Sequence, residues 1–128
     1  MLKYLHTMIR VGNLNKSIEF YTQVLDLSLH RKKAYPEGKF TLAFLGTSDL
    51  NSEPFLELTF NWDKDFYELG TAYGHMAFGC KDIFKTCEKI KRLGGKVIRE
   101  PGPMKNSTTV LAFIQDPDGY KIELIQRA

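Results

Sequence analysis

A nearly constant internal repeat limits the fold of this chain more than any other feature of its sequence. His75 follows His6 by 69 residues, and the same interval separates the segments LAFL and LAFI. Near the end of each copy, FLELTF (55–60) matches KIELIQ (121–126), after a loop that is three residues shorter in the second copy. Three matching segments in one order indicate that the chain contains the same structural unit twice.

Both copies are predicted to form a strand, a helix and three further strands, which together make a βαβββ module. In the first copy, the apolar periodicity predicts these elements at residues 5–11, 14–25, 28–33, 39–46 and 54–61. In the second copy, it predicts them at residues 74–80, 83–93, 96–100, 108–115 and 120–126. An α+β fold of two tandem modules with mixed sheets is therefore expected.

Capping residues support both predicted helices. Asn13 or Asn15 is suited to cap the first helix and Asp82 the second, because their side chains accept hydrogen bonds from free backbone N–H groups. The pair Gly94–Gly95 is suited to end the second helix. The chain is expected to be a single domain, residues 1–128, with modules at 1–60 and 75–128 and a linker at 61–74.

Two histidines and two glutamates occupy matching positions in the two copies. The histidines, His6 and His75, open the first strand of their modules. The glutamates, Glu57 and Glu123, lie between apolar residues of the last strands, where a covered carboxylate needs a partner charge, a metal or a raised pKa. The simpler interpretation is that the histidines lie at strand ends and the glutamates on sheet faces that are open to water. It would have to hold for all four residues. Two imidazoles and two carboxylates suit a divalent transition metal, so a metal site is favoured.

Composition excludes several other classes of function. The chain is 43% hydrophobic and 26% charged, which is ordinary for a globular protein, and its net charge of +3 is too small and scattered to indicate nucleic-acid binding. No apolar run is long enough to span a bilayer. The N-terminus has no targeting pattern, and Cys80 and Cys87 are expected to be free thiols, so a cytoplasmic location is expected.

Several longer motifs carry a resemblance to a known family. They are LHTMIRVGNLNKSIEFYTQVL, ELTFNW, GGKVIREPGP and above all the runs ELGTAYGH and DPDGYKIEL. With these motifs, nearly the whole chain resembles the glyoxalase I (lactoylglutathione lyase) family of the vicinal oxygen chelate superfamily, and its short bacterial members most. The resemblance implies paired modules that enclose a cupped site.

The resemblance also implies a metal centre and an assembly. The ligands would be His6, Glu57, His75 and Glu123, with two waters completing an octahedron. The active form would be a homodimer with two sites at the interface, each using His6 and Glu57 of one chain with the other two ligands from its partner. The resemblance to the short bacterial class favours Ni²⁺ or Co²⁺. Zn²⁺ stays possible, because histidine and glutamate serve all three ions.

The implied reaction is metal-dependent methylglyoxal detoxification by a carbon–sulfur lyase. Methylglyoxal and glutathione combine spontaneously to a hemithioacetal, which the enzyme isomerises to S-lactoylglutathione through an enediolate. A divalent ion stabilises the developing charge as a Lewis acid. By its position, Glu123 would be the base that removes the proton and then returns it to the neighbouring carbon.

Glutathione carries two carboxylates and an ammonium group, so its site needs cationic and amide contacts. Arg10 shares a strand face with His6, and Asn61 shares a face with Glu57. The resemblance further implies substrate contacts at the following residues: His75, Pro101, Gly102 and Lys105. After this lysine, bacterial relatives typically show a glycine pair, whereas this chain has Asn106-Ser107.

Other functions on the same fold remain alternatives at this stage. Ring-cleaving dioxygenases use two histidines and one carboxylate on iron, and a fourth ligand at Glu57 argues against that chemistry. Epimerases acting on coenzyme A thioesters often have glutamine where Glu57 stands. A non-catalytic metabolite-binding module would need no complete metal set, and fold alone does not exclude it.

Overall fold

The computed structural model describes residues 1–47 and 53–128. The chain divides into two compact units, Met1–Glu68 and Leu69–Ala128. Their boundary falls inside the segment predicted as a linker, 61–74. No helix in the described part of the chain is long and apolar enough to cross a membrane.

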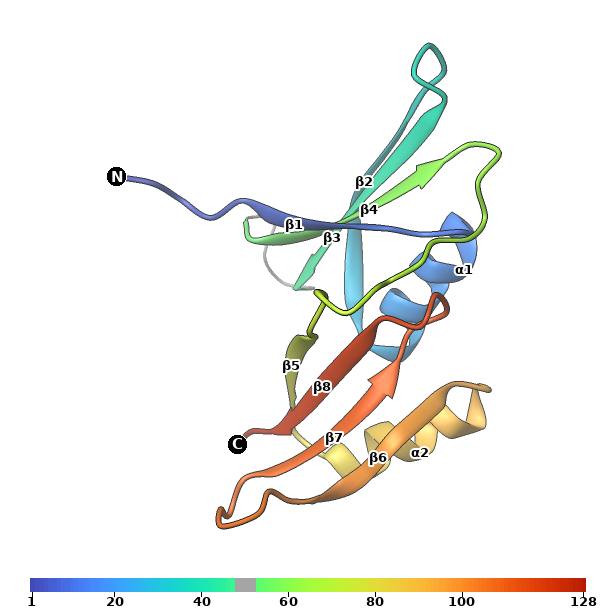
Figure 1. Cartoon of the computed structure of the whole chain (residues 1–128). Coiled ribbons are helices and arrows are strands. Elements are labelled where there is room, and N and C mark those ends of the chain that lie inside the picture. The colour runs from blue at the N-terminus through green and yellow to red at the C-terminus, as the bar shows by residue number, and fades with distance from the viewer. Residues whose placement is uncertain (48–52) are drawn as a thin grey trace. The chain divides into compact units, whose positions relative to one another are not determined.

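The first unit is a four-stranded mixed sheet with helical structure between its first two strands (Figure 1). Its elements are β1 (His6–Arg10), α1 (Leu14–Glu19), η1 (Phe20–Val24), β2 (Leu27–Tyr35), β3 (Phe40–Thr47) and β4 (Phe55–Asn61). The strand order is β1-β4-β3-β2. β1 runs parallel to β4, whereas β3 is antiparallel to both of its neighbours.

The second unit repeats this arrangement (Figure 1). Its elements are β5 (Met76–Cys80), α2 (Ile83–Arg92), β6 (Lys96–Pro103), β7 (Val110–Gln115) and β8 (Lys121–Gln126). The strand order is β5-β8-β7-β6, with β5 parallel to β8 and the other pairs antiparallel. The prediction of an α+β fold built from two tandem βαβββ modules is confirmed.

Each unit buries an apolar core between its helix and one face of its sheet. In the first unit, the core includes Ile9, Val11, Leu14, Tyr21, Ala43, Leu45, Leu56 and Leu58. In the second unit, it includes Ile83, Cys87, Ile90, Ala112, Ile114, Ile122 and Leu124. The buried face of the second helix is therefore formed by Ile83, Cys87 and Ile90. Because successive strand residues point to opposite faces, the other face of each sheet is left for the histidines and glutamates.

The first helix differs from the prediction of one regular helix over 14–25. Asn13 caps it, accepting a hydrogen bond from Lys16 N at 3.1 Å. After Glu19 the helix widens into the π-helical turn η1. Within it, Leu25 N donates to Phe20 O five residues back, and the Thr22 hydroxyl donates to Ile18 O at 2.7 Å. A threonine hydroxyl that takes a backbone carbonyl in this way favours such an irregularity.

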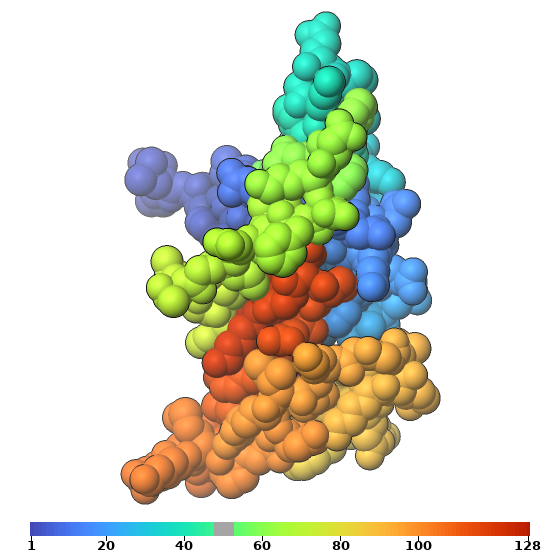
Figure 2. Space-filling model, turned by 45° about the vertical axis from the view of Figure 1, so that its right-hand side comes forward, coloured from blue at the N-terminus to red at the C-terminus, as the bar shows by residue number. Residues whose placement is uncertain are grey.

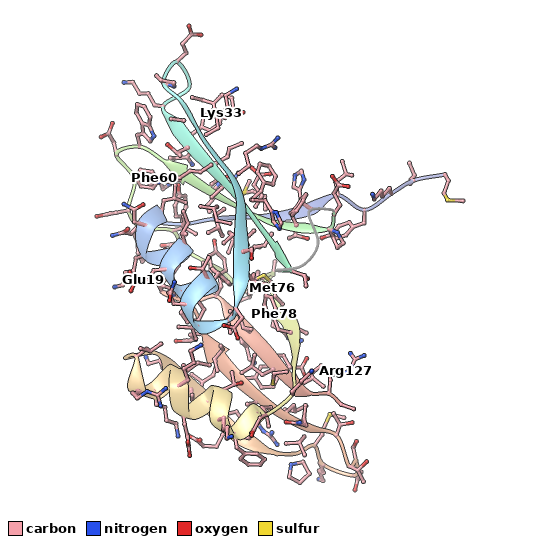
Figure 3. All side chains as sticks on the ribbon, turned by 180° about the vertical axis from the view of Figure 1, so that it is seen from behind. Glu19, Lys33, Phe60, Met76, Phe78 and Arg127 are labelled. Carbon is pink, nitrogen blue, oxygen red and sulfur yellow. The ribbon has the colours of Figure 1, made fainter. Side chains whose placement is uncertain are left out.

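Strand boundaries differ from the predictions by up to three residues, and two of the differences lie near candidate site residues. β5 begins at Met76, so His75 lies in the irregular segment just before the strand (Figure 3 labels Met76 and Phe78). β6 continues through Pro101 and Gly102 to Pro103, with two register shifts against β7. The second helix agrees with expectation, since Asp82 caps it and Gly94 follows its end with φ at 85°.

Candidate metal centre

The first unit brings His6 and Glu57 together. His6 lies in β1 and Glu57 in the neighbouring parallel strand β4, and the residue beside Glu57 in the register is Met8. Nε2 of His6 is 2.9 Å from Oε1 of Glu57, and the two side chains are 38% and 11% exposed. The second carboxylate oxygen, Oε2, accepts a hydrogen bond from the Thr59 hydroxyl at 3.1 Å. Glu57 is therefore a nearly buried carboxylate with both oxygens in contact.

The second unit repeats the pair with His75 and Glu123. Nε2 of His75 is 3.1 Å from Oε1 of Glu123, and the side chains are 40% and 16% exposed. Tyr73 holds the turn before His75 against β8, because its hydroxyl donates to Lys121 O at 3.0 Å. Its ring packs edge-on against Tyr120. Burial, reinforced by the Asp116 charge, raises the pKa of Tyr73, so its hydroxyl keeps the proton that it donates.

A phenylalanine packs against each histidine from β3 or β7, the strand on the other side of the one that carries the glutamate. The rings of His6 and Phe44 meet edge-on with centroids 5.5 Å apart, and those of His75 and Phe113 do so at 5.4 Å. In the strand registers, Phe44 lies opposite Glu57 and Phe113 opposite Glu123. These phenylalanines belong to the repeated LAF segments, so the repeat itself contained the signal for them.

A cation lies over each of these phenylalanines. The guanidinium of Arg31 is 4.5 Å from the centroid of Phe44, and the ammonium of Lys121 is 4.4 Å from that of Phe113. The sequence did not single out Arg31. A register shift between Leu29 and Arg31 changes which residues of β2 share a face, and simple alternation does not reveal such a shift.

Both pairs have the donor atoms and the spacing that a divalent ion requires. Two donors at neighbouring positions of an octahedral ion, each bonded at about 2.1 Å, lie about 3 Å apart. The separations of 2.9 Å and 3.1 Å agree with that value. Within residues 1–47 and 53–128, no group of three or more histidine, cysteine, aspartate or glutamate side chains is gathered around one point. Each unit thus supplies two candidate ligands.

The candidate substrate residues of the first unit lie near its metal pair in the sheet. Arg10 is exposed at the end of β1, opposite Thr59 in the register. Asn61 ends β4, and its amide donates to the Tyr67 hydroxyl at 2.9 Å. The indole of Trp62 instead donates to the buried Thr41 at 2.9 Å.

Three of the candidate substrate residues of the second unit lie around the turn between β6 and β7, and the fourth, His75, lies just before β5. Pro101 and Gly102 belong to the last part of β6, and Lys105 is exposed in the turn. The segment that contains β6 and this turn is coloured orange in Figure 2. Asn106 adopts a φ of 61°, a left-handed conformation that asparagine and glycine accept more readily than other residues. The asparagine therefore takes a conformation that glycine would otherwise supply.

Arg99 stabilises the start of this turn, and sequence reasoning missed it. Its guanidinium donates from Nη1 to Gly102 O at 3.1 Å and to Leu111 O at 2.7 Å, and from Nη2 to Pro103 O at 3.1 Å. Gly102 and Pro103 end β6 after its register shifts, and Leu111 lies opposite Gly102 in β7. One planar guanidinium thus satisfies three carbonyls and shapes the segment next to Lys105.

A cavity of about 490 Å³ opens beside His6 within the first unit. It is lined by Leu5, His6, His30, Arg31, Phe44, Glu53 and Phe55. Glu53 already forms an ion pair with Lys3 at 3.0 Å, a contact that lowers the pKa of its carboxyl. The cavity combines aromatic walls with the Arg31 cation, which suits a ligand that has both apolar and anionic parts.

Comparisons with known proteins agree with this architecture. Residues 3–124 match the model of the Glyoxalase/Bleomycin resistance protein/Dioxygenase superfamily. A lactoylglutathione lyase of Neisseria meningitidis is 58% identical over 126 residues, which cover 98% of this chain and 91% of the relative. The chain belongs to the glyoxalase I branch of this superfamily. A lactoylglutathione lyase of Escherichia coli O157:H7 is 54% identical over 98% of this chain and 93% of its own length.

Solved structures of glyoxalase I proteins share the fold. Glyoxalase I from Zea mays has a TM-score of 0.94 at 48% identity over 98% of this chain, and this chain spans 45% of the maize chain. A trypanothione-dependent glyoxalase I from Leishmania major has a TM-score of 0.87 at 40% identity, covering 98% of this chain and 87% of its own. Relatives of this branch therefore occur both near this chain's length and about twice as long.

Proposed function

We propose that this chain isomerises the hemithioacetal of methylglyoxal and glutathione to S-lactoylglutathione. The observation that carries the proposal is the pair of repeated His–Glu contacts, at 2.9 Å and 3.1 Å, in a chain 58% identical to a lactoylglutathione lyase. It is a carbon–sulfur lyase that detoxifies methylglyoxal. The expected cytoplasmic location stays a prediction.

The metal site contains His6, Glu57, His75 and Glu123. Each unit supplies one imidazole and one carboxylate, so a site with four protein ligands needs two units. One pair comes from a first unit and the other from a second unit. Both pairs come together across a homodimer interface, with His6 and Glu57 of one chain opposite His75 and Glu123 of the other. The donor set is compatible with Ni²⁺ or Co²⁺, which we favour, and with Zn²⁺.

Glu123 is the catalytic base and then the acid. A bound divalent ion would supply Lewis-acid stabilisation of the negative charge that develops on the substrate oxygens. The Glu123 carboxylate removes the proton from the carbon bearing sulfur, and the C–H electron pair passes into the enediolate. The same carboxyl then returns the proton to the neighbouring carbon, so the substrate is isomerised without an external oxidant or reductant. The 16% exposure of its side chain limits competing water.

The glutathione part of the substrate is bound by groups around the two pairs. Arg10 and Lys105 are exposed cations suited to its carboxylates, and Asn61 offers an amide. The backbone at Pro101 and Gly102 lines the same region of β6, whose shape depends on Arg99. The cationic character of these contacts matches a ligand with two carboxylates.

Metal removal and replacement test this function. The protein is stripped with a chelator, and nickel, cobalt, zinc and manganese are restored separately. Thioester formation is then followed from preformed hemithioacetal. We expect no activity in the stripped protein and recovery with nickel or cobalt. A protein that stays inactive with all four ions, or a stripped protein that keeps full activity, would contradict the proposal.

A further inference from the structure

The two repeated His–Glu pairs differ in what holds the glutamate. Oε2 of Glu57 accepts a hydrogen bond from the Thr59 hydroxyl at 3.1 Å, while Oε1 contacts His6. The carboxylate of Glu123 contacts His75 at 3.1 Å. In the described part of the chain, no second protein donor reaches the Glu123 carboxylate.

The difference comes from one side chain, because the positions themselves match. Thr59 lies two residues after Glu57, and Ile125 lies two residues after Glu123. Thr59 is opposite Leu42 in β3, and Ile125 is opposite Leu111 in β7. The second unit therefore has an apolar side chain where the first has a hydroxyl.

The Thr59 hydroxyl has a strong effect on Glu57 because both residues are almost completely shielded from water. Thr59 is 8% exposed and Glu57 9% exposed, so water competes weakly for the carboxylate. A hydrogen bond to an ionised group in such surroundings is strong and fixes the orientation of that group. Removing a group that hydrogen-bonds to a metal ligand in this way commonly lowers metal affinity by about 10- to 100-fold.

We propose that Thr59 is a positioning residue that fixes Glu57 as a permanent metal ligand. The apolar Ile125 leaves Glu123 without such a restraint, so that its carboxylate can turn between the metal and the substrate. The duplicated halves thereby acquire different tasks, one for metal retention and one for proton transfer. This inference rests on the proposed function, since it explains why Glu123 and not Glu57 serves as the base.

Three variants test the role of the hydroxyl, with metal affinity as the first measurement. Affinity is measured on purified protein by competition with a chromophoric chelator, independently of turnover. Thr59→Val should weaken nickel binding by about tenfold or more, and Thr59→Ser should bring it back towards the wild-type value. Thr7→Val is the matched control, because Thr7 is exposed on the opposite face of β1, and it should bind nickel as the wild type does.

The converse variant adds a hydroxyl beside the base. Ile125→Thr should restrain Glu123 and lower kcat by about tenfold, while KM stays within about twofold and nickel binding does not weaken. Unchanged nickel affinity in Thr59→Val, no recovery in Thr59→Ser, or wild-type kcat in Ile125→Thr would overturn the inference. A wild-type protein that binds nickel but forms no thioester contradicts the proposed reaction. The nickel affinities of Thr59→Val and Thr59→Ser test the positioning role of Thr59 even in that case.

Discussion

Glu57 and Glu123 occupy the same position in the two halves, yet their surroundings suit them to different chemistry. Glu57 has both oxygens in contact and a side chain 11% exposed. Glu123 has one described partner, His75, and a side chain 16% exposed. A base must exchange a proton with the substrate, so the less restrained carboxylate is the better candidate.

Glu123→Gln tests this assignment at the residue scale. The amide keeps an oxygen for the metal but does not accept the proton, so kcat should fall by about 10²-fold or more while most of the bound metal is retained. Turnover and metal content are measured on the same sample. Glu88→Gln, an exposed change on α2, is the control. Wild-type turnover in Glu123→Gln would refute its role as base.

Cys87 gives a second prediction at this scale. Burial, with the Glu100 charge adding to it, raises the pKa of Cys87 to about 11 from an ordinary value of 9.0. Between these values the unfolded chain loses the thiol proton and the folded chain keeps it, so the free energy of unfolding falls as pH rises.

Urea unfolding of the wild type and Cys87→Ala, at about pH 8 and about pH 10.5, measures this effect. The variant should lose less stability than the wild type between the two values, because it lacks the titrating group. Any difference caused by the smaller side chain itself is already present at the lower pH. An equal loss in both proteins would contradict the raised pKa of Cys87.

At the scale of elements, sequence periodicity predicted the order and type of the strands and helices but not their irregularities. Hydroxyl bonding by Thr22 widens the first helix, and no apolar pattern reveals such a bond. The sequence EPGP at 100–103 resembles the end of a strand, yet β6 continues through it. The guanidinium of Arg99 accompanies this continuation by donating to Gly102 O and Pro103 O, which are contacts that no apolar pattern reveals.

Arg99→Lys tests the importance of that element for substrate binding. An ammonium does not reproduce the planar set of bonds to Gly102, Pro103 and Leu111, so the turn that carries Lys105 should lose its shape. We expect KM for the hemithioacetal to rise by about three- to tenfold and kcat to change by less than about twofold. Arg92→Lys, on the exposed face of α2, is the control. An unchanged KM in Arg99→Lys would remove this role.

At the scale of the whole molecule, the internal repeat predicted a duplicated fold, and the structure confirms it. The repeat also placed a histidine and a glutamate in each half, and each pair meets within its own unit. Four residues around the site were beyond sequence reasoning: Arg31, Arg99, Thr59 and Ile125. Thr59 and Ile125 look like ordinary strand residues, and their contrast has meaning only once the carboxylate contacts are known.

The central claim is that both halves of the repeat bind the same ion. X-ray absorption spectroscopy of the nickel-loaded protein measures this most directly, because scattering from imidazole rings is counted per metal. For the wild type we predict six nitrogen or oxygen ligands per nickel ion, two of which are imidazoles. For His6→Ala and for His75→Ala we predict one imidazole per nickel ion. A single imidazole in the wild type, or a count that one of these substitutions leaves unchanged, would contradict the shared site.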